Sequence, residues 1–168
     1  MVAKSKYMNR FAFPVFLYAL FCFFGCSEKN DPVCACDTIN ALLDSSATVV
    51  VGRVIDGDTF NFGIGKDSFS VRILGIDAFE TQHGARLDSQ AIKAGISIDS
   101  AYILGKSGKL FADSLLSKKK VLLVRDYSQD NFDNYSRILR HVYYYQGDMP
   151  HDFGSLMINK GFALTDTL

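Results

Sequence analysis

Residues 48–64 read "TVVVGRVIDGDTFNFGI", in which two apolar-rich runs flank the sequence Asp-Gly-Asp. Asp-Gly between alternating apolar residues is typical of a β-hairpin turn, so this stretch predicts two antiparallel strands. The next segment, "SFSVRILGI" at 68–76, is again rich in apolar and β-branched residues and follows a second turn signal, "GKDS". The sequence therefore predicts a three-stranded meander that begins near residue 48.

The hairpin turn carries two carboxylates, those of Asp56 and Asp58. It could be an acidic turn and nothing more, or it could form one wall of a metal site, because a tight bend can present carboxylate oxygens to an ion. This stretch alone favours the simple turn. Residues elsewhere in the chain must decide whether it is also a site.

Four further elements are expected after the meander. They are a helix at 107–120 with Ser107 as its N-cap, strands at 121–126 and 137–145, and a helix at 151–161 that stops at Gly161. Residues 84–106 lack a clear period and predict an irregular or partly helical excursion. This order of strands and helices predicts a mainly β fold with helices (α+β), built on a small five-stranded barrel.

The N-terminal segment predicts an export signal rather than part of the fold. A basic start precedes an uninterrupted apolar run at 11–24, which is shorter than the roughly 20 residues that a membrane-spanning helix needs. The run ends at Gly25-Cys26, which is similar to a bacterial lipobox and implies cleavage after Gly25 and lipid attachment to Cys26.

We therefore expect three parts: a signal peptide at 1–25, a lipidated cysteine and linker at 26–37, and one domain at 38–168, which could start with a short helix at 38–44. The expected location is the cell surface or the outer membrane, with a secreted or periplasmic protein as the alternative. Membrane contact would be made through the lipid on Cys26. Cys34 and Cys36 lie in the linker and are either incidental or joined in one local bridge.

The charge balance limits the kind of partner. The sequence has 18 Lys and Arg and 18 Asp and Glu, and removal of the three basic residues of the signal leaves 15 against 18, a net charge of −3. A slightly acidic domain has no global field that attracts polyanions. Any nucleic-acid contact must therefore be local or assisted by a bound cation.

Several charged residues stand in unusual places. Arg72 lies inside an apolar strand, where a lone charge is costly unless it is paired or faces a site. Asp77 and Glu80 follow the end of that strand, and Arg137 opens a later one. Each has an ordinary explanation as well, such as an Asx turn at Asp77 or an ion pair of Arg137 with a nearby aspartate.

Taken together, four stretches resemble the signature blocks of the staphylococcal nuclease (thermonuclease) family, in the same order. They are "IDGDTF" at 55–60, "VRILGIDAFET" at 71–81, "DNYSR" at 133–137 and "LMINKGFA" at 156–163, against family patterns of the type D-G-D-T, R-L-x-x-[IV]-D-x-P-E-T, D-x-Y-G-R and L-[VIL]-x-x-G-x-A. The resemblance covers about residues 48–165. It implies an oligonucleotide/oligosaccharide-binding (OB-fold) barrel.

The resemblance also implies roles for individual residues. Asp58 and Asp77, with the backbone carbonyl of Ala78, would hold one Ca²⁺, and Asp56 would lie beside these ligands without binding the ion. Glu80 would be the general base, and Arg72 and Arg137 would clamp the phosphate. These residue types suit phosphodiester hydrolysis, because a hard cation prefers oxygen ligands and guanidinium groups bind phosphate in a bidentate manner.

Arg72 and Asp77 are five positions apart, so on an ideal strand their side chains would point to opposite faces. We therefore predict a bend or bulge at Gly75, between them.

The chain departs from the family pattern at several places. Ala78-Phe79 stands where Thr-Pro is usual, Ser136 replaces a glycine, and the 84–106 stretch is longer than expected. The family's last helix and its nucleotide-binding tyrosines have no counterpart after "GFAL", so Tyr127, Tyr135 or Tyr143 to Tyr145 would have to replace those tyrosines.

Two functional hypotheses follow. The first is an exported Ca²⁺-dependent nuclease that hydrolyses DNA and RNA endonucleolytically and leaves 3′-phosphate ends. The alternative is a weak or inactive nuclease-like barrel that binds nucleic acid or another molecule at the cell surface. No protein partner is predicted, and we expect a monomer.

Overall fold

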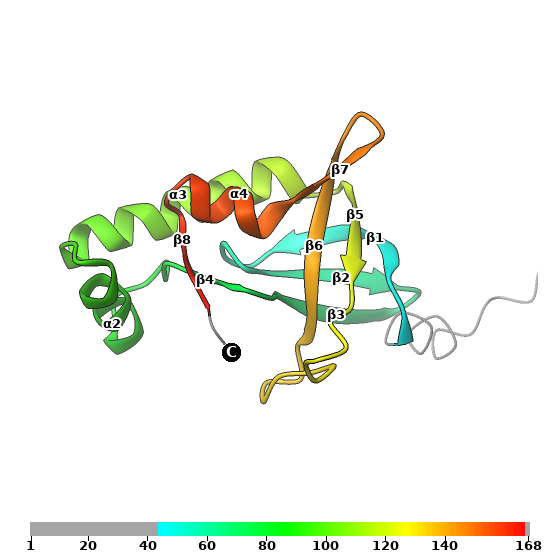
Figure 1. Cartoon of the computed structure of the whole chain (residues 1–168), viewed down its shortest axis with the longest axis horizontal. Helices are drawn as coiled ribbons and strands as arrows, with labels where there is room; N and C mark the ends of the chain where they lie inside the picture. The colour runs from blue at the N-terminus through cyan, green and yellow to red at the C-terminus, as the bar shows by residue number, and fades with distance from the viewer. Residues whose placement is uncertain (1–43, 167–168) are drawn as a thin grey trace, which may run out of the picture. The chain divides into compact units, whose positions relative to one another are not determined.

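Five strands close into a mixed β-barrel in the computed structural model, which describes residues 44–166 (Figure 1). The strands β1 (Ala47–Val54), β2 (Thr59–Ile64) and β3 (Asp67–Ile73) form the antiparallel meander that the sequence predicts. The strands β5 (Lys120–Val124) and β6 (Ile138–Gln146) continue from β1, and a parallel pairing of β3 with β6 closes the barrel. The predicted α+β barrel of the OB type is confirmed.

The barrel is held together by side chains that alternate along its strands. Residues at every second position, such as Phe60 and Phe62 of β2 and Val71 and Ile73 of β3, are buried. Burial of one such side chain contributes about 1.5–3 kcal/mol, so this interior provides much of the stability of the fold.

The turn between β1 and β2 is tight and is packed against other elements. The amide of Ile55 donates to the carbonyl of Thr59 over 2.8 Å, which closes the bend around Asp56, Gly57 and Asp58. A Cβ atom at Gly57 would lie 2.7 Å from the Cβ of Ala78, so a side chain there would push the turn away from β4 (Ile76–Ala78). Glycine is therefore required by the close approach.

The third predicted strand is interrupted where the sequence analysis expects an irregularity. The strand β3 ends at Ile73, Gly75 has a φ of 79°, and β4 starts after it at Ile76. This short strand pairs with β8 (Ala163–Thr165) instead of continuing in the barrel. The break between the two strands confirms the predicted bend at Gly75. Glycine suits this position because it adopts a positive φ without strain.

The excursion at 84–106 is more regular than predicted. It contains α2 (Ala85–Ala94) and the first half of α3 (Ile98–Leu116). The N-cap of α3 is Ser97, whose side chain accepts from the amide of Ser100 over 3.1 Å, so the prediction of Ser107 as N-cap was wrong. Two glycines within α3 obscure its period, because glycine carries no side chain to mark a buried face.

The C-terminal part of the described chain follows the prediction more closely. A hairpin strand β7 (Met149–Asp152), which the sequence analysis did not anticipate, pairs with β6 and leads into α4 (Phe153–Asn159). The side chain of Asp152 caps α4 by accepting from the amide of Ser155 over 3.1 Å. Figure 1 shows α2 at the end of α3 that lies farthest from this hairpin.

The predicted signal peptide, Cys26, Cys34, Cys36 and nearly all of the expected helix at 38–44 lie outside the described residues. Within 44–166, no helix has the length and apolar character that crossing a membrane would require.

Candidate active site

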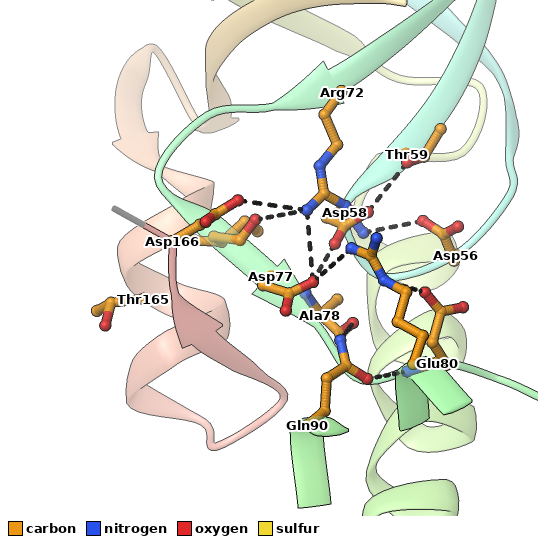
Figure 2. Close-up of polar contacts among 12 residues, drawn as sticks. Asp56, Asp58, Thr59, Arg72, Asp77, Ala78, Glu80, Gln90, Thr165 and Asp166 are labelled. Atoms are coloured by element: carbon orange, nitrogen blue, oxygen red, sulfur yellow. Dashed lines mark hydrogen bonds and ion pairs between the residues drawn. The ribbon is translucent and has the colours of Figure 1, made fainter. Parts of the chain in front are cut away.

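Asp58 is the buried centre of the candidate site (Figure 2). It lies in the turn directly before β2 and is 2% exposed, and its Oδ2 accepts from the amide of Ala78 over 2.7 Å. Its Oδ1 accepts from the hydroxyl of Thr59 over 3.0 Å and pairs with Nη1 of Arg72. Burial raises the pKa of Asp58 to about 6, with a contribution from the nearby charge of Asp56, while Arg72 and the Ala78 amide oppose the shift.

Asp56 supports the turn and also lines the cavity beside Asp58. Its Oδ1 accepts from the amide of Asp58 over 3.2 Å, as in an Asx turn. The two carboxylates of the Asp-Gly-Asp stretch thus differ in their partners: Asp56 accepts from a backbone amide of the turn, and Asp58 pairs with Arg72.

Arg72 connects β3 to the strand that follows the bend. Its Nη2 donates to the carbonyl of Ile76 over 3.1 Å and lies 3.5 Å from Oδ1 of Asp77 and 3.7 Å from Oδ2 of Asp166. Figure 2 shows the Arg72 guanidinium facing the carboxylates of Asp77 and Asp166. The turn at Gly75 therefore brings Arg72 and Asp77 to one side, as the predicted bend requires.

An arginine of α2 lies across the other carboxylates. Arg86 donates from Nη2 to Oδ1 of Asp77 over 2.8 Å, and its Nε lies 2.7 Å from Oε1 of Glu80. Burial lowers the pKa of Arg86, but the hydrogen bond to Asp77 and the charges of Asp77 and Glu80 outweigh that effect and raise it overall. Asp77 is consequently shared by two guanidinium groups.

Arg137 reaches the same region from the position directly before β6. Its Nε pairs with Oδ2 of Asp133 over 2.6 Å, and its Nη1 donates to the hydroxyl of Thr59 over 3.3 Å. The ring of Tyr135 lies beside it, with the Arg137 Cζ 5.3 Å from the ring centroid. The expected aspartate partner is present, and the guanidinium also points toward the turn that carries Asp58.

A cavity of about 480 Å³ collects these groups. Its lining includes Asp58, Arg72, Ala78, Glu80, Arg86 and Arg137. Among the tyrosines named as possible nucleotide contacts, Tyr135 lines the cavity and is 80% exposed. The cavity therefore joins carboxylates with three arginines, which is a suitable environment for a phosphate group.

The loop before Arg137 explains one departure from the family pattern. Ser136 has a φ of 60°, in the left-handed region that glycine adopts without strain. The amide of Ser136 donates to the carbonyl of Asp133 over 3.0 Å, and the Asp133 side chain accepts from the amides of Tyr135 and Arg137, each over 2.9 Å. The serine is tolerated because these bonds hold the turn.

Residues 70–167 match the family described as staphylococcal nuclease homologue. The chain belongs to the staphylococcal nuclease family. It is also similar to the uncharacterized protein MJ1439 of Methanocaldococcus jannaschii, with 27% identity over 116 residues. That match covers 67% of this chain and spans 56% of the relative's length.

The donor groups of this family member fit a hard cation in chemical type. Asp58, Asp77 and the carbonyl of Ala78 offer oxygen atoms, which Ca²⁺ prefers. Within residues 44–166, no three carboxylate, imidazole or thiol side chains converge as a metal cage. The carbonyl of Ala78 already accepts from Nε2 of Gln90 over 2.8 Å, so a cation would have to use its second lone pair. Water or substrate oxygens would have to complete such a shell.

Three residues of this nuclease-family site were not predicted from the sequence. Arg86 and Gln90 lie on α2, within a stretch whose helical period was not recognised, and Asp166 follows β8. A helical pattern at 85–94 would have placed Arg86 and Gln90 at positions i and i+4, on one face. No local signal marks Asp166, because its approach to Arg72 depends on the pairing of β8 with β4.

Proposed function

We propose that this protein is a Ca²⁺-dependent nuclease that hydrolyses phosphodiester bonds of DNA and RNA endonucleolytically and leaves 3′-phosphate ends. The observation that carries the proposal is a continuous contact path between two arginines. Arg72 pairs with Oδ1 of Asp58, which accepts from Thr59, whose hydroxyl in turn accepts from Arg137. Two guanidinium groups are thus held at one cavity wall, a geometry that suits one bound phosphate.

The chain's own groups can perform most of the reaction. Arg72 and Arg137 would bind the non-bridging oxygens of the phosphate and balance the charge that grows on them in the transition state. Glu80, whose side chain is 35% exposed at the cavity, would accept a proton from the attacking water. The water oxygen would bond to phosphorus, and the bond to the 5′ oxygen would break. That oxygen would take up a proton from solvent and leave as a 5′-hydroxyl, so the phosphate stays on the 3′ side.

Calcium, when bound by Asp58, Asp77 and the Ala78 carbonyl, would supply positive charge next to the phosphate. Arg86 occupies Oδ1 of Asp77, so a cation at that oxygen would compete with its guanidinium group. The Arg86 Nε likewise contacts Oε1 of Glu80, so that oxygen would be shared between the ion pair and the proposed role as base. Arg86 thus contacts one oxygen of each carboxylate.

The proposed setting is outside the cell. Residues 1–25 would direct export, and cleavage after Gly25 would leave Cys26 free to carry a lipid at the cell surface or outer membrane. In that place, a monomeric domain at 38–168 would degrade nucleic acid from the environment. A Cys26→Ser variant should then be released from membranes, and unchanged retention would contradict the anchor.

A second candidate function is a barrel that binds nucleic acid without cleaving it. The specific observation in its favour is that Arg86 engages both Asp77 and Glu80, which neutralises the proposed base. This binding module would keep the arginine-rich cavity and lose the hydrolytic step.

Cleavage assays separate the two functions. Purified protein should cleave plasmid and single-stranded DNA and RNA with Ca²⁺ and lose that activity in EDTA. Glu80→Gln should slow cleavage by about 10²–10⁴-fold, the usual contribution of a general base, with substrate affinity retained. A folded wild-type protein that binds but does not cleave with Ca²⁺ would establish the binding module instead.

A further inference from the structure

The loop that carries Glu80 lies between two regular elements. The strand β4 ends at Ala78 and α2 begins at Ala85, so Phe79 and Glu80 are outside both. The family pattern that the chain resembles has a proline just before the glutamate, and Phe79 stands there instead. Something other than a proline ring must therefore fix the backbone of this loop.

One buried side chain spans the loop. Gln90 of α2 is 3% exposed, its Nε2 donates to the carbonyl of Ala78 over 2.8 Å, and its Oε1 accepts from the amide of Glu80 over 2.9 Å. Figure 2 shows Gln90 beneath the loop, in contact with Ala78 and Glu80. An amide can donate and accept at the same time, whereas a carboxylate can only accept. Glutamine is thus matched to both peptide groups that flank Phe79.

The side chain of Phe79 anchors the same loop from within. It is 3% exposed and packs in a small core with Leu87 and Ala91 of α2 and Ala101 of α3. This core is separate from the interior of the barrel. The loop is therefore fixed by both a buried ring and a buried amide.

The backbone of α3 lies directly against the loop. A Cβ atom at Gly105 would lie 2.1 Å from the carbonyl oxygen of Glu80 and 2.7 Å from that of Phe79. Both neighbours are backbone atoms, so a side chain at this position would have to displace the loop. The helices α2 and α3 thus pack against the segment that carries Glu80 and restrict its conformation.

We propose that Gln90 is a positioning residue, which sets the direction of the Glu80 carboxylate by holding the peptide groups on both sides of Phe79. This inference rests on the proposed nuclease function. It also assigns a purpose to the helical excursion at 84–106, which replaces the stiffness of a proline with contacts from α2 and α3. Gln90 itself is not among the residues that line the cavity, so it would act through Glu80.

The main test compares Gln90→Met with Gln90→Glu and with Gln146→Met, which changes an exposed glutamine at the end of β6. In Gln90→Met, kcat should fall by about tenfold to a hundredfold, because a small misplacement of a catalytic group is costly, while KM changes less than threefold. Gln90→Glu keeps the bond to the Glu80 amide, so its kcat should lie between the values for Gln90→Met and wild type. Gln146→Met should match wild type.

Two further measurements separate positioning from general stability. In a Glu80→Gln background, Gln90→Met should cause no additional loss of rate, since the group that it positions is already gone. Hydrogen exchange at the Glu80 amide should become at least tenfold faster in Gln90→Met, with exchange in the barrel strands unchanged. Gly105→Ala should reduce kcat by displacing the same loop from the α3 side, and this variant keeps the test available if Gln90→Met does not fold.

Unchanged exchange at the Glu80 amide in a folded Gln90 variant would overturn the inference, whatever the activity. Faster exchange with an unchanged kcat, or an equal rate loss in the Glu80→Gln background, would reduce Gln90 to a structural role and would also overturn it. A wild-type protein without any cleavage would refute the proposed function and remove the catalytic part of the inference. The exchange result would then still show whether Gln90 holds the loop.

Discussion

Replacing Arg86 with methionine should tighten the binding of Ca²⁺ to this protein. In the structure Arg86 donates to Oδ1 of Asp77 over 2.8 Å, so a cation at that oxygen would compete with the guanidinium group. Its side chain is 56% exposed, and ion pairs of such exposed groups contribute about 0.2–1 kcal/mol each. Loss of the two pairs that it makes therefore favours the cation by about 1 kcal/mol, or roughly a fivefold lower Kd.

Calorimetric titration of Ca²⁺ into wild-type and Arg86→Met protein, at low and moderate ionic strength, measures this effect directly. The gain should shrink as salt is added, because partly exposed charges are screened. Lys93→Met is the matched control, since it removes a positive charge from the same helix but leaves the contacts of Asp77 and Glu80 in place. An affinity that is unchanged or weaker in Arg86→Met, or an equal gain in Lys93→Met, would refute the reasoning.

Three other outcomes are expected. Arg72→Met should lower the free energy of unfolding at pH 7 by about 3–5 kcal/mol, because it leaves the buried carboxylate of Asp58 without its ion-pair partner. If denaturant unfolding shows a loss below 1 kcal/mol, the ion pair of Arg72 with Asp58 contributes little to the free energy of unfolding. The raised pKa of Asp58, about 6, means that the folded state binds the Asp58 proton more tightly than the unfolded chain between about pH 4 and 6, so this group's stabilising contribution is lost as pH rises through that window. Asp58→Asn should therefore gain stability relative to wild type from pH 4 to 7, by up to about 3 kcal/mol, and a difference that is constant with pH would contradict the shift. Ser136→Gly should raise the melting temperature slightly, with a gain of about 0.5–1 kcal/mol from relief of a φ of 60°, and a measurable loss would show that the serine side chain is needed.

The sequence predicted the barrel because its strands carry their own signals. The meander at 48–76 combines two turn sequences with alternating apolar residues, and each feature acts over a few neighbouring positions. The bend at Gly75 followed from a conflict between strand geometry and the side on which Arg72 and Asp77 had to lie. Such local rules are sufficient where one face of each strand is buried.

The helical excursion could not be predicted in the same way. Gly105 and Gly108 lie on the buried side of α3, where Gly105 allows contact with the Glu80 loop and Gly108 faces Phe162. These glycines are suitable here because each allows a close contact with a residue that is distant in the chain. Their intrinsic helix propensity is low, so the local sequence argues against a helix. Tertiary contact therefore overrides the local signal.

The candidate site was predicted as a set of residues but not as a network. The motifs indicated Asp58, Arg72, Asp77, Glu80 and Arg137, and the structure places all of them in one charged region, where their catalytic roles stay predictions. Motifs do not show which carboxylate is paired with which arginine in the absence of a ligand. The contacts of Arg86 depend on the orientation of α2, which no short pattern encodes.

The pairing of β4 with β8 has a consequence for the order in which the protein matures. Residues 76–78, which include two of the proposed cation ligands, depend on a partner strand at 163–165 that is synthesised much later. The barrel strands all precede that partner, so a growing chain can assemble its scaffold while this strand is still missing. Contacts that join distant segments form late in folding and open first when only a few residues take part. The barrel would therefore be folded before the proposed cation site is complete. Local opening at β8 would disrupt that site, and with it the proposed activity, without unfolding the barrel.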